Sequence, residues 1–217
     1  MSDIEPPAGV AAPDGDRPDG RTLRSQRTRR SIVEALRALV IEGDLRPTTE
    51  AVAQRAGVSE RSIFQHFVDR EALLLALGEY QLAHIATMVR SISADASLAH
   101  RLDEVAAQQA KIWEEVTPVR RAAILTEPFS PAIHRALAFF RSTTHDEIGR
   151  IFANELLALQ IGDRQIVHEG MTAVAEWPFW ESLRAHQGVS IVDATTTLRH
   201  SLAAIISAPS AVAKGSL

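Results

Sequence analysis

The stretch TEAVAQRAGVSERSIFQHF, Thr49–Phe67, contains two short helical patterns separated by a tight turn. In the first pattern, Val52 and Ala56 lie four residues apart and therefore share one face of a helix. Gly57 can adopt a positive φ, which a reversal of the chain at this point requires. Ser59 is a favoured N-cap residue for a second helix. The stretch therefore predicts a helix, a turn and a second helix.

The second helix has an apolar face and a polar face. Ile63 and Phe67 form an apolar pair, and we expect both of them, together with Phe64, to be structural. The layout is that of a helix-turn-helix unit, whose second helix lies in the major groove of DNA. Polar side chains on that helix can reach base edges, and the predicted base contacts are Arg61, Ser62 and Gln65. Because two short helices cannot bury a core alone, a third must support them, and the apolar pattern of residues 32–40 predicts one.

The run RAGVSERSIFQHFVDREALLLAL, residues 55–77, resembles the DNA-binding domain of TetR-family transcriptional regulators. The resemblance covers residues 27–77 and is loose over the C-terminal half. It implies a dimeric regulator, a repressor that binds a palindromic operator and is released by a small effector. Two positions depart from the family's usual pattern. Phe64 stands where a tyrosine commonly touches a DNA phosphate, and Arg70 stands where a lysine does so.

Positive charge is concentrated around this motif. The whole chain carries −4, but residues 21–72 hold ten arginines and seven acidic residues. Their first ten residues, RTLRSQRTRR, form either an arm that neutralises DNA phosphates, with Arg21 or Arg24 in a minor groove, or the solvated start of a helix. Because this run lies directly beside the helix-turn-helix motif, we favour the arm over the solvated helix start. The predicted phosphate contacts are Thr49, His66, Arg70, Arg21, Arg24, Arg27, Arg29 and Arg30.

Composition narrows the class of protein further. The chain has no cysteine, which excludes disulfides and thiolate metal sites. No apolar run approaches the roughly 18 residues that a membrane span needs, and no export signal is visible, so we expect a cytoplasmic protein without a membrane segment. Residues 1–20 contain four prolines and no periodicity, which predicts a disordered tail.

The predicted fold is all-α, with an N-terminal three-helix helix-turn-helix domain, a C-terminal helical bundle regulatory domain and about nine or ten helices. Asp69 is expected to cap a helix that runs to about Ser91, and Pro118 is expected to end one helix and open another. Later helices are expected at 131–160, 164–176, 179–187 and 191–207. The predicted division is a tail at 1–20, a DNA-binding domain at 21–72, and a ligand-binding and dimerisation domain at 73–217.

A single small reading head makes few base contacts, so two heads one helical turn apart are expected to read a palindrome. The resemblance places the homodimer interface in the last two long helices, about residues 163–177 and 190–207. It also implies a small, largely apolar effector in the C-terminal half, although aromatic residues at helical spacing are more often core. The candidate pocket residues are Trp113, Phe139, Phe140, Phe152, His134, His168, Met171 and Trp177.

Catalytic patterns are missing from the sequence. There is no nucleophile elbow and no Gly-rich phosphate loop. Adjacent pairs such as His168 and Glu169 point to different faces of a helix and do not form a helical zinc site. We therefore expect no catalytic residue, no metal and no cofactor. The alternative to a regulator is a ligand-binding or protein-interaction module that has lost specific DNA binding, which Phe64 and the acidic Glu60 favour.

Overall fold

The computed structural model describes residues 20–208, and within them the chain is all helical, with ten α-helices and no strand. The predicted tail lies outside the described residues, apart from Gly20, which begins the first helix. The elements are α1 (Gly20–Ile41), α2 (Thr49–Ala56), α3 (Glu60–His66), α4 (Arg70–Ala86), α5 (Leu98–Ile124), η1 (Glu127–Phe129), α6 (Pro131–Ile151), α7 (Ala153–Ala158), α8 (Ile161–Ala175), α9 (Trp177–Glu181), η2 (Ser182–His186) and α10 (Ile191–Ser207). The prediction of nine or ten helices is confirmed for this part of the chain. None of the helices between residues 20 and 208 is long and apolar enough to cross a membrane.

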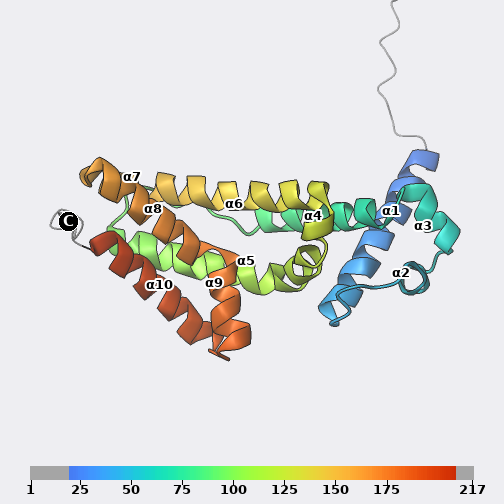
Figure 1. Cartoon of the computed structure of the whole chain (residues 1–217). Coiled ribbons are helices and arrows are strands. Elements are labelled where there is room, and N and C mark those ends of the chain that lie inside the picture. Colours follow the sequence, from blue (N-terminus) through green and yellow to red (C-terminus); the bar gives the residue numbers. More distant parts are fainter. Residues whose placement is uncertain (1–19, 209–217) are drawn as a thin grey trace, which may run out of the picture.

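The molecule is elongated, with α1, α2 and α3 at one end and α7 at the other (Figure 1). The core of the end that carries α3 includes Ile32 from α1, Val52 from α2 and Ile63 from α3. It also includes Val119 and Ala122 from α5, far along the chain. The three-helix head is therefore packed against α5 as well as joined to α4. This core therefore continues across residue 72, since it also contains Leu73 and Leu77 of α4.

Two predicted helix boundaries in the first half are wrong. The fourth helix ends at Ala86 rather than near Ser91. The predicted break at Pro118 does not occur, because α5 runs through it to Ile124. Proline removes its own N–H from the helical ladder and crowds the carbonyl of the preceding turn, a cost that packing can offset. The valines on either side, Val116 and Val119, are buried and hold the helix in place.

The expected long helix at 131–160 is divided into α6 and α7 at Phe152. Arg101, which is buried on α5, donates a 2.8 Å hydrogen bond from Nη1 to the last carbonyl of α6, that of Ile151. The same guanidinium binds both carboxylate oxygens of Glu155 on α7. A side chain fifty residues away in sequence thus satisfies the end of α6, which local patterns do not reveal.

The expected break at Gly162–Asp163 is also misplaced, since α8 begins at Ile161 and includes both residues. The corner before α8 is held by Arg164, whose guanidinium donates to the carbonyls of three residues, Leu156, Leu157 and Leu159. The segment expected as one helix at 179–187 is instead α9 followed by the π-helical turn η2. The last helix, expected at 191–207, is confirmed.

Candidate nucleic-acid interface

The turn between α2 and α3 has the geometry that the sequence predicted. Gly57 has φ 67° and ψ 32°, the left-handed conformation, and the Val58 N–H closes the end of α2 with a 3.0 Å bond to the Ala53 carbonyl. The Ser59 hydroxyl accepts a 3.2 Å bond from the Ser62 N–H, which confirms Ser59 as the N-cap of α3. At the start of α2 the cap is Thr48, which leaves Thr49 as the first helical residue.

The short helix α3 presents its polar side chains outward. Ile63 and Phe67 are each 2% exposed and anchor the helix in the head core. Arg61 and Gln65 lie exposed four residues apart on the opposite face, with Ser62 half-buried beside them. The structure thus brings the three predicted base contacts together on one outer face of one capped helix.

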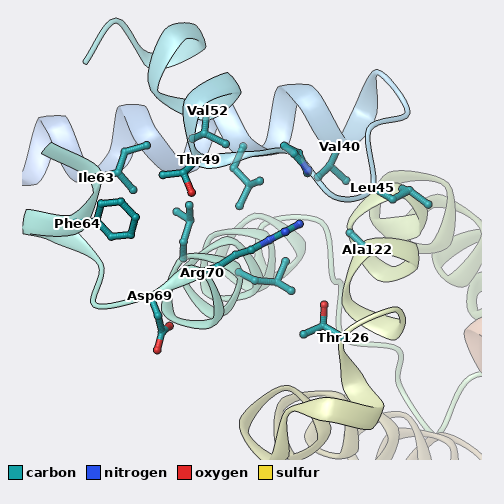
Figure 2. A pocket seen from close by; sticks show the side chains of 14 residues that line it. Val40, Leu45, Thr49, Val52, Ile63, Phe64, Asp69, Arg70, Ala122 and Thr126 are labelled. Carbon is teal, nitrogen blue, oxygen red and sulfur yellow. The ribbon is translucent and has the colours of Figure 1, made fainter. Parts of the chain in front are cut away.

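Phe64 differs from the expectation of a structural residue, since its side chain is 57% exposed. It lines a small crevice between the head and α5, together with Thr49 and Arg70 (Figure 2). Arg70 extends from the start of α4 into this crevice. The crevice has a cavity volume of about 30 Å³, which holds about two water molecules and is too small for an organic effector.

Arg29 has a structural role that the sequence did not reveal. Its Nη1 donates a 3.0 Å hydrogen bond to the carbonyl of His66, the last residue of α3. Its guanidinium lies 4.3 Å from the centroid of the Phe67 ring, within cation–π distance. Arg29 therefore fastens the C-terminal end of α3 to α1. Only its place in a run of arginines was visible in the sequence, and that run indicated phosphates.

The basic run at residues 21–30 is helical, as part of α1. Arg21, Arg24 and Arg27 are exposed and recur every three residues, so they follow one another along the helix. Arg30 pairs with Glu34 one turn further on, at 2.8 Å. The run is therefore helical with its cations directed to the surface, and their contact with DNA phosphates stays a prediction.

The eight candidate pocket residues do not surround one cavity. Phe152 and Met171 are fully buried in the cluster between α5, α6, α8 and α10. Trp113, Trp177 and, at its edge, Phe140 belong to a second cluster between α5 and the α9–η2 segment. The other three occupy separate places: Phe139 is 58% exposed, His134 faces Glu127 at 3.2 Å, and the His168 ring stacks on that of His145.

The two helices of the predicted dimer interface, α8 and α10, pack against each other on one side of the molecule. Along α10, Ala194, Leu198 and Leu202 are buried within the chain's own core. Exposed apolar side chains remain at Ile166 on α8 and at Val192 on α10. Both helices therefore also have an exposed face that does not contribute to the core of the chain. Among residues 20–208, no group of three His, Asp or Glu side chains is placed to hold a metal ion.

The comparisons with known proteins agree with this geometry. Residues 32–77 match the sequence model of the family described as bacterial regulatory proteins, tetR family. No curated protein matches the sequence of the chain.

Three solved structures have a similar fold. A protein from Rhodococcus sp. assigned to the TetR family of transcriptional regulators is 21% identical, covers 83% of this chain and all of its own, and has a TM-score of 0.64. A second one with that assignment, from Mesorhizobium loti MAFF303099, is 20% identical, covers 84% of this chain and 96% of its own, and has a TM-score of 0.53. A transcriptional regulator of the TerR/AcrR family from Aquifex aeolicus VF5 is 15% identical, covers 82% of this chain and 99% of its own, and has a TM-score of 0.54. Residues 32–77 therefore match the tetR family of bacterial regulatory proteins, in a chain whose fold is similar to that of structures assigned to TetR-family transcriptional regulators.

Proposed function

We propose that this protein is a dimeric, cytoplasmic transcriptional repressor that binds a palindromic operator and is released by a small, largely apolar effector. The observation that carries the proposal is the outer face of α3, where Arg61 and Gln65 are exposed beside Ser62 on a helix capped at its start and anchored in a core. A fixed helix with free polar side chains is what direct reading of a major groove requires.

The chemistry of these side chains assigns each a preferred base. Arg61 can donate two hydrogen bonds to O6 and N7 of guanine, and Gln65 can pair with N6 and N7 of adenine. Ser62 can donate or accept and is less selective. Because Arg61 and Gln65 lie one helical turn apart, they would contact neighbouring base pairs of one half-site.

Phosphate contacts would then fix the register of α3 in the groove. Thr49 lies in the first turn of α2, where backbone N–H groups and the helix dipole favour an anion. His66 at the end of α3 and Arg70 at the start of α4 would add contacts, and Arg21, Arg24 and Arg27 would extend them along α1. Arg29 and Arg30 already bind His66 and Glu34, so they are the weakest members of the predicted set.

Dimerisation would supply the second reading head. One α3 covers a single half-site, whereas two related by a twofold axis read a palindrome with half-sites one helical turn apart. The exposed faces of α8 and α10, which include Ile166 and Val192, support an interface there. Both helices lie away from α3, so an interface there would leave both copies of α3 free (Figure 1).

Release by an effector requires a link between the regulatory half and the head, and α5 supplies one. Arg37 on α1 binds Glu115 on α5 and also donates to Gln81 on α4, at 3.3 Å. Arg46, in the loop before α2, donates a 3.2 Å bond to the carbonyl of Leu125 just after α5. An effector that favours another position of α5 would therefore favour another position of the head, and operator affinity would fall by population shift.

Selection of bound duplexes from a random DNA library at about 150 mM salt tests the proposal, because phosphate contacts alone enrich no sequence. We expect a palindrome, whose half-site spacing gives the distance between the two heads. The selected duplex then serves as the probe for effectors that release it. A folded protein that enriches no sequence would instead support the alternative, a binding module without specific DNA recognition. The exposed Phe64, which lacks a phosphate-binding hydroxyl, is the observation that favours that alternative.

A further inference from the structure

One cluster of charged side chains lies between α5, α6 and the corner that joins α8 to α9. It consists of Arg120 on α5, Arg141 on α6, Glu127 on η1 and Glu176, the residue between α8 and α9. Its centre is Arg120, whose Nε is buried and has no hydrogen-bond acceptor among the described residues. A buried donor without an acceptor costs about 1–3 kcal/mol or more when the group is charged. Such a donor suggests a partner that is not part of the protein chain.

The charges around Arg120 do not supply that partner. Glu127 is engaged elsewhere, since its Oε1 accepts from Arg141 at 3.3 Å and faces the His134 ring nitrogen at 3.2 Å. Burial lowers the pKa of the Arg120 guanidinium, and the nearby charge of Arg141 lowers it further. Burial also raises the pKa of the Glu176 carboxyl. Both charges are therefore held at a cost in free energy that a bound ligand could offset.

The apolar surroundings indicate what else such a ligand would touch. The guanidinium carbon of Arg120 lies 5.9 Å from the centroid of the Trp177 ring. Trp177 belongs to the apolar cluster that also holds Trp113, with Phe140 packed at its edge. On the solvent side, the Arg141 side chain is 36% exposed, which leaves the cluster open at α6. The site thus offers a cation beside aromatic surface.

We propose that Arg120 binds the carboxylate of a small organic acid whose apolar body packs on Trp177 and Phe140, and that this acid is the effector. The proposal rests on the proposed function and names its effector class. A singly charged acid fits best, because Arg141 is already paired with Glu127 and the Glu176 carboxylate would repel a dianion. The geometry of a guanidinium, with donors in a planar fork, matches a carboxylate.

The position of Arg120 explains how such a ligand would act on the head. Arg120 lies between Val119 and Ala122 in sequence, and both of these pack into the core of the head. The next residue, Arg121, donates to both carboxylate oxygens of Glu181 on α9, from Nε at 2.7 Å and from Nη2 at 3.0 Å. A ligand that draws Arg120 toward Trp177 would therefore shift the segment of α5 on which the head rests.

Thermal unfolding in the absence of DNA tests this proposal independently of operator binding. The probes are matched pairs of an acid and its neutral amide: benzoate with benzamide, phenylacetate with phenylacetamide, and hexanoate with hexanamide. We expect at least one carboxylate to raise the unfolding temperature saturably while its amide does not. Arg120→Met should weaken that binding at least about tenfold, since a charged hydrogen bond is removed. The matched control Arg135→Met, an exposed arginine on α6, should keep the response.

Two results would overturn the proposal. The first is wild-type protein that responds no more to any of the three acids than to its amide, a comparison that needs no variant. The second is an Arg120→Met protein that responds like the wild type. A further check uses the protein without probes, in which Arg120→Met should unfold at the same temperature or higher, because an unpaired buried charge is removed. A clear loss of stability there would show that the chain itself already compensates the Arg120 charge.

Discussion

At the scale of single residues, the exposed ring of Phe64 is a test of how the head meets the DNA backbone. It lies beside Thr49 and Arg70, two predicted phosphate contacts, but it has no polar atom (Figure 2). Phe64→Tyr should tighten binding to the selected operator about tenfold, because a hydroxyl can donate to a phosphate oxygen. Fluorescence anisotropy titration at fixed salt measures the change. Phe139→Tyr, the same substitution at an exposed position on α6, is the control, and an equal effect of both would contradict the placement of Phe64.

The pair of Arg101 and Glu155 is a second residue-scale test, of stability. Arg101 is 3% exposed, so Glu155→Gln would leave a buried guanidinium without its anion and cost about 3 kcal/mol of unfolding free energy. Glu147→Gln, which breaks the exposed pair with Arg150, should cost less than about 1 kcal/mol. Urea unfolding at pH 7 compares the two. Equal losses would mean that burial of Arg101 does not matter.

The same pair sets a pH dependence whose sign follows from the pKa of Glu155. Hydrogen bonds from Arg101 lower that pKa below the ordinary value of 4.5. The stabilisation is therefore complete above pH 4.5 and is lost as the pH falls through the lowered pKa. Glu155→Gln should remove this part of the acid transition. A variant that loses stability in acid as steeply as the wild type would place the titration in other groups.

At the scale of elements, substitutions at two glycines distinguish an effect of backbone conformation on stability from an effect of packing. A Cβ at either Gly57 or Gly78 would meet no other atom within 4 Å, but Gly57 has φ 67° and Gly78 lies inside α4. Gly57→Ala should cost about 1–2 kcal/mol, because L-residues resist the left-handed conformation. Gly78→Ala should stabilise by up to about 1 kcal/mol, because alanine favours a helix interior. Thermal unfolding distinguishes the two, and changes of equal sign would refute the assigned turn.

How much of this fold the sequence predicted depends on how local each signal is. The turn at Gly57, the caps at Ser59 and Asp69, and the last helix depend on neighbouring residues and were predictable. The end of α6 depends on Arg101 and the end of α3 on Arg29, contacts across 50 and 37 residues that no local pattern encodes.

The same distinction between local and long-range signals applies to the candidate interface and the candidate pocket. The predicted base contacts follow from the helical spacing within α3, whereas the aromatic residues predicted to form a pocket have the spacing of any core helix. The structure distributes them over two clusters and the surface. Arg120 could not be recognised, because an arginine on a helix is usually solvated and only the packing around it shows that its Nε is buried.

At the scale of the whole molecule, the charge along α1 should determine how binding depends on salt. Arg21, Arg24 and Arg27 lie on α1 before the part of the chain that matches the family. Replacing all three by glutamine should lower the slope of log affinity against log salt by about 0.9 for each phosphate that the variant no longer neutralises. Titrations at several salt concentrations measure the slope. The control is a double variant, Arg90→Gln with Arg135→Gln, which replaces exposed arginines in the regulatory half and should leave the slope unchanged. An unaltered slope in the triple variant would show that this end of α1 does not contact DNA.

The central claim is that α3 of each of two heads reads base edges through Arg61. Its most direct test is the random-library DNA selection carried out in parallel with the wild type and with Arg61→Ala. We predict that the wild type selects a palindrome and that Arg61→Ala loses about 1–3 kcal/mol and its preference at one symmetric pair of positions, most simply a guanine in each half-site. A variant that binds every sequence more weakly by the same factor, with an unchanged preference, would contradict the claim and make Arg61 a phosphate contact.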